Sequence, residues 1–125
     1  MKMKQTENEV KKAIKEYLEY NKYTVYRINN AGGYRGDDTQ GKPRFSFAGT
    51  PGVADLYAVK KGDYPLWIEA KATGKTPSNY QLTFGVCVNA SFGTFWIWAD
   101  SLEMFVPKFL GIVNNKGQAI GLQNR

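Results

Sequence analysis

The sequence contains no histidine and a single cysteine, Cys87, among its 125 residues. Without histidine, Ser-His-Asp and Cys-His catalytic groups, HExxH metalloproteases and two-histidine zinc sites are all excluded. A lone cysteine excludes an intrachain disulfide framework, a cysteine-rich zinc site and an iron–sulfur cluster. Any chemistry must therefore come from carboxylates, lysines, hydroxyls and amides, or from a metal ion held by oxygen ligands.

Long apolar runs are also missing. No stretch approaches the roughly 20 apolar residues of a membrane span. The N-terminal residues are basic, but a polar amphipathic run follows them in place of the apolar core of a signal peptide. We therefore expect a cytosolic or intravirion protein with no membrane partner.

The composition indicates one globular, basic domain over residues 1–125. Hydrophobic residues make up 42% of the chain, which is typical of a folded protein, and the length allows a single modest core. There are 17 lysines and arginines against 11 acidic residues, for a formal charge of +6. This excess favours a polyanionic partner such as nucleic acid.

Side-chain periodicity and capping residues predict an α/β fold. Helical spacing of apolar residues, with a capping-box pattern at Thr6 and Glu9, predicts a first helix over residues 6–20. Strands are predicted at residues 23–28, 55–59, 66–71 and 94–99, and the last of them is expected to be a buried central strand. Two further helices are predicted at residues 76–89, with Thr76 as the N-cap, and at residues 101–109. Residues 29–43, with four glycines, are predicted to form a long loop. The order is that of an α-β-β-β-α-β sandwich with a central mixed sheet and a C-terminal helix.

The hairpin formed by the second and third of these strands brings two carboxylates together. If its bend centres on Gly62, residue i faces residue 124 − i, and Asp55 lies opposite Glu69. Facing carboxylates repel each other and destabilise a strand pair. Their presence here therefore indicates a bound cation, and oxygen ligands of this kind suit Mg²⁺ or Mn²⁺.

Two neighbours of Glu69 extend this site. Lys71 lies two residues further along the strand, so its side chain projects from the same face as that of Glu69. Ala70 points into the core, which leaves its backbone carbonyl as a further ligand. An ammonium group beside two carboxylates can orient a water molecule or neutralise charge on a phosphate. The alternative is an ordinary surface salt bridge between Glu69 and Lys71.

The first helix supplies a third carboxylate. Glu7 falls on the apolar, core-facing stripe of that helix, whereas Glu9 lies about 100° away. A glutamate that faces the core requires a partner or a metal ion. Alternatively, Glu7 interacts favourably with the helix dipole at a solvated edge.

Taken in order, these residues resemble the VRR-NUC (virus-type replication-repair nuclease) domains of the PD-(D/E)XK nuclease superfamily. The matching segments are Thr6-Glu7, Asn29-Asn30-Ala31-Gly32-Gly33, Gly52-Val53-Ala54-Asp55, Ile68-Glu69-Ala70-Lys71 and Thr76-Pro77-Ser78-Asn79-Tyr80-Gln81. Ala54 stands where the family often has proline. That proline shapes the backbone and is not a ligand.

The resemblance implies a restriction-endonuclease-like fold and a role for each residue. Asp55, Glu69 and the Ala70 carbonyl would be metal ligands, and Glu7 a further ligand, directly or through water. Lys71 would position the attacking water and stabilise the transition state. Gln81 would steady Lys71, the water or the phosphate, unless it is only an exposed residue at a helix start.

The function implied is that of a Mg²⁺- or Mn²⁺-dependent DNA endonuclease. We expect it to cut branched or structured DNA, such as Holliday junctions or flaps, in phage replication, recombination or repair. We also expect a homodimer in the cytoplasm of a bacterial or phage-infected cell. Four basic residues are expected to contact the DNA backbone unless they are simply solvated: Arg35, Lys42, Arg44 and Lys75. The alternatives are a catalytically weak nucleic-acid-binding module and a non-enzymatic protein-interaction domain.

Overall fold

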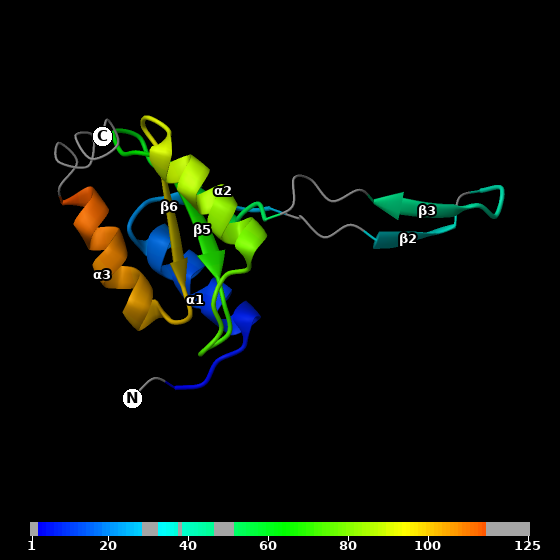
Figure 1. Cartoon of the computed structure of the whole chain (residues 1–125), viewed down its shortest axis with the longest axis horizontal. Coiled ribbons are helices and arrows are strands. Elements are labelled where there is room, and N and C mark those ends of the chain that lie inside the picture. Colours follow the sequence, from blue (N-terminus) through cyan, green and yellow to red (C-terminus); the bar gives the residue numbers. More distant parts are fainter. Residues whose placement is uncertain (1–2, 29–32, 38, 47–51, 115–125) are drawn as a thin grey trace.

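A computed structural model of the protein describes residues 3–28, 33–37, 39–46 and 52–114. Its elements, in chain order, are α1 (Glu7–Tyr20), β1 (Thr24–Arg27), β2 (Gly33–Asp37), β3 (Pro43–Ser46), β4 (Leu56–Val59), β5 (Leu66–Ala70), α2 (Asn79–Ala90), β6 (Phe95–Ala99) and α3 (Leu102–Val113). The protein is an α/β protein with a mixed four-stranded sheet and three helices (Figure 1).

Helix α1 begins as its sequence predicts. The Thr6 side chain accepts a hydrogen bond from the backbone N–H of Glu9, and the Glu9 carboxylate accepts one from the N–H of Thr6. This reciprocal capping box satisfies two of the four free N–H groups at the helix start. Val10, Ile14 and Leu18 follow at helical spacing and are fully buried against the sheet.

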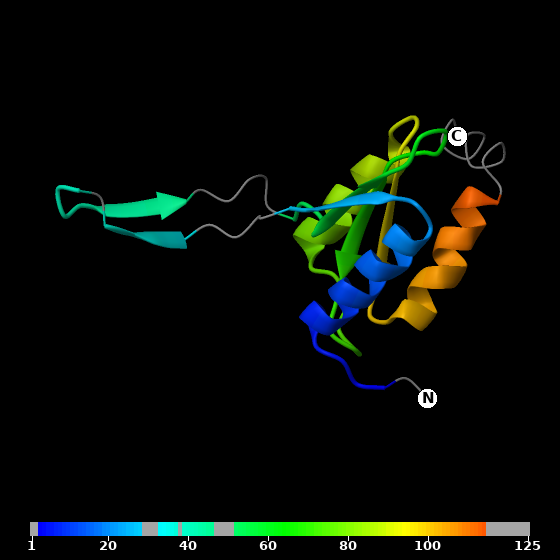
Figure 2. The ribbon, with the colours of Figure 1, turned by 180° about the vertical axis from the view of Figure 1, so that it is seen from behind.

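The four-stranded sheet has the order β1-β4-β5-β6. Strand β4 is antiparallel to both of its neighbours, β1 and β5, whereas β6 runs parallel to β5. Helices α1 and α3 cover one face and α2 covers the other (Figures 1 and 2). The core lies mainly on the α1 and α3 side, where Ile14, Ile68 and Phe105 pack together. The predicted mixed sheet is therefore confirmed.

Strand β6 corrects one expectation. Its continuous aromatic run predicts a central strand, but β6 lies at an edge of the sheet. The run is apolar on both sides because α2 and α3 both pack against this strand, one on each face. A strand that is covered by helices on both faces has a continuous apolar sequence even at the edge of a sheet. This sequence pattern is therefore the same as that of a buried central strand.

Two predicted helix boundaries are also wrong. Helix α2 begins at Asn79, two residues later than predicted, because Ser78 and not Thr76 is its N-cap. Helix α3 has the predicted cap, Ser101, but continues to Val113 despite Pro107 in its interior. Its last turn still has apolar side chains, Ile112 and Val113, that pack against the core.

The predicted loop over residues 29–43 contains structure of its own. Strands β2 and β3 pair with each other in an antiparallel, two-stranded sheet with an irregular register. Figures 1 and 2 show this hairpin extending away from the four-stranded sheet. Residues 29–32 of the matching Asn29–Gly33 segment lie outside the described residues.

None of the helices in the described part of the chain is both long enough and apolar enough to cross a membrane.

Candidate active site

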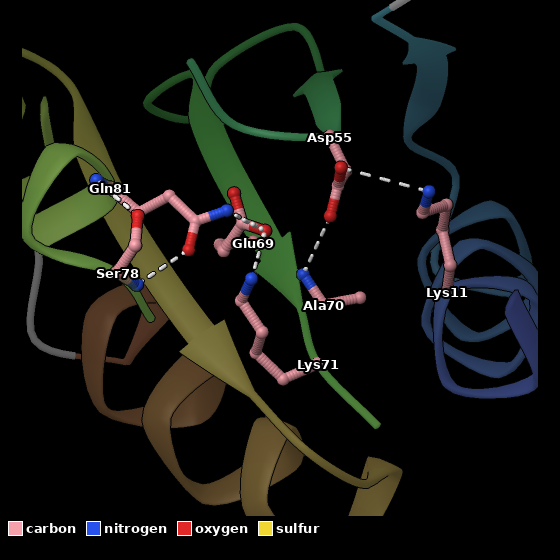
Figure 3. A network of polar contacts seen from close by, with 7 residues as sticks. All are labelled: Lys11, Asp55, Glu69, Ala70, Lys71, Ser78 and Gln81. Atoms are coloured by element: carbon pink, nitrogen blue, oxygen red, sulfur yellow. Dashed lines mark hydrogen bonds and ion pairs between the residues drawn. The ribbon is translucent and has the colours of Figure 1, made fainter. Parts of the chain in front are cut away.

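The predicted pair of carboxylates lies at one end of the four-stranded sheet. In the β4–β5 hairpin, Leu56 pairs with Ile68 and Ala58 pairs with Leu66. This register continues to Asp55 opposite Glu69, as the position of Gly62 in the turn predicts. Figure 3 shows Asp55 just before β4 and Glu69 on β5. Side chains alternate along β5, so the core residues Leu66 and Ile68 point away from the face that carries Glu69.

Glu69 is the most buried charged residue among those described, with 1% of its surface exposed. Its Oε2 atom accepts a hydrogen bond from Gln81 Nε2 at 3.0 Å and lies 3.5 Å from the ammonium nitrogen of Lys71. Its other oxygen, Oε1, is buried and has no hydrogen-bond partner within the described structure. A buried carboxylate oxygen without a partner is costly, and such atoms indicate a proton or a ligand.

The surroundings of Glu69 change its acidity. Burial, and after it the negative charge of Asp55, raise the pKa of its carboxyl, which reaches about 8 when all influences are combined. Lys71 opposes this shift because its positive charge favours the ionised form. Without a cation, Glu69 is therefore largely protonated at neutral pH.

Asp55 joins the end of β5 to helix α1. Its Oδ2 atom accepts a hydrogen bond from the backbone N–H of Ala70 at 3.1 Å, and its Oδ1 atom lies 3.7 Å from Lys11 Nζ (Figure 3). The N–H and C=O groups of one residue point to the same side of a strand. The Ala70 carbonyl therefore faces the Asp55 side of β5, as a metal ligand there requires.

The Gln81 side chain both caps helix α2 and binds Glu69. Its Oε1 atom accepts a hydrogen bond from the N–H of Ser78 at 2.7 Å and closes the capping box of α2, while its Nε2 atom donates to Glu69. The resemblance implies that Gln81 steadies Lys71, a water or the phosphate. Its side-chain partners in the structure are Ser78 and Glu69. The Ser-x-x-Gln spacing is the signal from which this cap could have been predicted.

Glu7 and Lys11 lie one turn apart on α1. Glu7 is half-buried in the first turn, but no three acidic, histidine or cysteine side chains of the described residues come together to hold a metal ion. Glu7 therefore does not form such a group with Asp55 and Glu69. The residue of α1 that contacts the acid pair is Lys11, which the sequence analysis missed. No sequence spacing links Lys11 to Asp55, so this contact had no signal in the sequence.

The four predicted DNA contacts lie elsewhere. Arg35 is in β2, Arg44 is in β3, and the exposed Lys42 precedes β3, so all three belong to the hairpin that extends from the body. Lys75 is exposed in the turn after β5 and lines a hollow of about 620 Å³ with Lys4 and Gln5.

The residues present fit a magnesium or manganese ion. Such ions take oxygen ligands, and Mg²⁺ is commonly held by one or two carboxylates together with water and substrate phosphates. Asp55, Glu69 and the Ala70 carbonyl supply ligands of this type, and the unpartnered Oε1 atom of Glu69 is available for a bond. A magnesium site of this type therefore does not require a third carboxylate from the protein.

Gly52 connects the segment before Asp55 to the start of α2. Its φ of +87° favours glycine, and a Cβ atom there would lie 2.3 Å from the carbonyl oxygen of Tyr80. Gly52→Ala is expected to destabilise the protein by roughly 2–5 kcal/mol, because left-handed strain and a backbone clash add together. Urea unfolding measures this.

Gly62 provides the matched control for that substitution. It has a φ of +88°, but no atom lies within 4 Å of an added Cβ. Gly62→Ala should therefore cost only about 1–2 kcal/mol of strain. Equal losses in the two variants would show that the contact of Gly52 with Tyr80 does not constrain the start of α2.

Comparisons with protein-family models, with curated proteins and with solved structures find no match for this chain.

Proposed function

We propose that the protein is a metal-dependent DNA endonuclease of the PD-(D/E)XK type. The observation that carries this proposal is the environment of Glu69. A fully buried carboxylate has one unpartnered oxygen, faces a second carboxylate and contacts a lysine and a glutamine. A purely structural salt bridge does not require a second acid beside it, and perturbed ionisable groups of this kind are typical of functional sites.

In the proposed reaction, water attacks a phosphodiester bond without a covalent intermediate. Asp55, Glu69 and the Ala70 carbonyl would hold the ion, which when bound would supply Lewis-acid charge at the phosphate. Lys71 orients the attacking water and balances negative charge that develops on the phosphate. Gln81 holds Glu69 in place through its Nε2 atom. Glu7 as an additional ligand stays a prediction of the resemblance.

Several finer features belong to the same proposal. The α-β-β-β-α-β order of the main sheet and its helices is compatible with a restriction-endonuclease-like fold, to which β2 and β3 add an inserted hairpin. We infer branched or structured DNA as the substrate and the cytoplasm as the location from the resemblance to VRR-NUC domains. The same resemblance suggests a homodimer, which light scattering of the purified chain can test.

One assay tests the proposed activity. The protein is incubated with four-way junction, flap, duplex and single-stranded DNA in Mg²⁺, Mn²⁺ or EDTA, beside the Asp55→Asn variant. We expect cleavage of at least one structure with Mg²⁺ or Mn²⁺, and none with EDTA or with the variant. DNA binding without cleavage in any metal would favour the binding-module alternative. Absence of both would favour a protein-interaction domain.

A further inference from the structure

A basic groove lies between helix α1 and the edge strand β1. Its volume is about 520 Å³, and its charged lining consists of Lys11, Lys12, Lys15, Glu16, Glu19 and Arg27. On α1 the groove is lined from Asn8 to Glu19, which is about three helical turns or roughly 16 Å along the helix axis. Figure 2 shows α1 and β1 on the same side of the molecule. The groove is long enough for several nucleotides of a single strand.

This groove lies next to a hollow at Asp55. A smaller hollow of about 230 Å³ is lined by Lys11, Arg27, Ile28 and Asp55. The two hollows share Lys11 and Arg27, so they adjoin at these residues. Lys11 reaches Asp55 from α1, on the other side of the site from Lys71 (Figure 3). The basic groove therefore adjoins a hollow that is lined by Asp55, one of the two acids of the candidate active site.

The positive charges of the groove are available to a ligand. Lys11 is only 15% exposed, and its single ion pair in the described structure, to Asp55, is longer than a hydrogen bond at 3.7 Å. Arg27 is exposed on β1, and none of the described carboxylates pairs with it. Lys15 binds Glu19 at 2.9 Å, but pairs of this kind on a helix surface contribute only about 0.3–0.5 kcal/mol. A phosphate can therefore compete for these groups.

We propose that the groove defined by Lys11, Lys15 and Arg27 binds the phosphate backbone of the DNA strand that is cut, next to the scissile phosphate. This inference rests on the proposed function, since it takes the acid pair as the point of cleavage. Lys11 and Lys15 are one helical turn apart and can contact neighbouring phosphates, while Arg27 reaches the same strand from β1. Contacts of this type position a strand without reading its sequence.

Binding measurements without cleavage test the groove. Fluorescence anisotropy with labelled single-stranded and junction DNA in EDTA gives the affinity over a range of salt concentrations. The variants are Lys15→Gln, Arg27→Gln and the double variant, with Lys61→Gln, exposed in the β4–β5 turn, as the matched control. We expect the double variant to bind at least 10-fold more weakly. Its salt dependence should also fall by about 0.7–0.9 in slope for each lost contact.

The outcomes separate this inference from the proposed function. Unchanged affinity and slope in the double variant, in a protein that cleaves DNA, would overturn the groove alone. Weaker binding by the groove variants in a protein that never cleaves would support the groove and overturn the nuclease. Failure of the wild type to bind any DNA, or tighter binding to a matched RNA strand, would overturn the assignment of the groove to DNA.

Discussion

Replacing Lys71 with alanine is expected to reduce the rate of DNA cleavage by about 10³-fold or more at saturating Mg²⁺. Lys71 Nζ lies 3.5 Å from Glu69 Oε2, and its side chain is only 14% exposed. Ions from the solvent cannot reproduce the position of an ammonium group that is held this close to Glu69. Single-turnover cleavage of the preferred DNA structure measures the effect on the chemical step.

The pH dependence of cleavage distinguishes a role of Lys71 in the chemical step from simple neutralisation of the charge of Glu69. Lys71 lowers the pKa of Glu69, so its removal raises that pKa further. The residual activity of Lys71→Ala should therefore increase up to a higher pH than that of the wild type. Lys61→Ala, in the exposed turn, serves as the control and should cleave normally. Wild-type rates in Lys71→Ala would remove this lysine from the mechanism.

Replacing Glu69 with glutamine is expected to stabilise the metal-free protein at high pH while it abolishes cleavage. The pKa of Glu69 is raised from 4.5 to about 8 in the folded protein, so the folded state binds the proton more tightly than the unfolded state. The contribution of Glu69 to stability is thus present below pH 4.5 and is lost as the pH rises through 8. At pH 9 in EDTA, Glu69→Gln should therefore be the more stable protein, by up to about 5 kcal/mol if the whole shift is expressed.

With Mg²⁺ bound, the wild type should instead be more stable than Glu69→Gln. Binding requires the ionised carboxylate, so the affinity of the wild type for Mg²⁺ should be about 100-fold weaker at pH 6 than above pH 8. Mg²⁺ should raise the melting temperature of the wild type at pH 8 and leave that of Glu69→Gln unchanged. Scanning calorimetry with and without EDTA measures both effects. A variant less stable than the wild type at every pH would contradict the assignment of an unpartnered carboxylate at this position.

The centre of the site could be predicted from sequence because a hairpin obeys simple geometry. A turn around Gly62 fixes which residues face each other, and a period of two fixes which side chains share a face. Asp55, Glu69 and Lys71 follow from these two rules alone. The start of α1 was predictable for a similar reason, since the Thr6–Glu9 capping box depends only on neighbouring residues.

The remaining features depend on contacts that sequence spacing does not encode. Thr76-Pro77 and Ser78 with Gln81 three residues later are both patterns of a helix start, but the bond of Gln81 to Glu69, which accompanies the second pattern in the structure, does not follow from spacing. The contact of Lys11 with Asp55 depends on how α1 lies across the sheet. The edge position of β6 depends on the helices that cover its two faces.

The pairing of β4 with β5 also has an evolutionary consequence. A residue gained or lost within segments 55–59 or 65–69 would shift Asp55 by one position relative to Glu69 and turn it to the opposite face of the sheet. Under the proposed function, we therefore expect selection for the acid pair to fix the lengths of these two segments. The β2–β3 hairpin pairs only with itself in the strand order, so changes in its length leave the acid pair in register. Among active descendants of this sequence, insertions and deletions should accumulate in that hairpin and not in these strands.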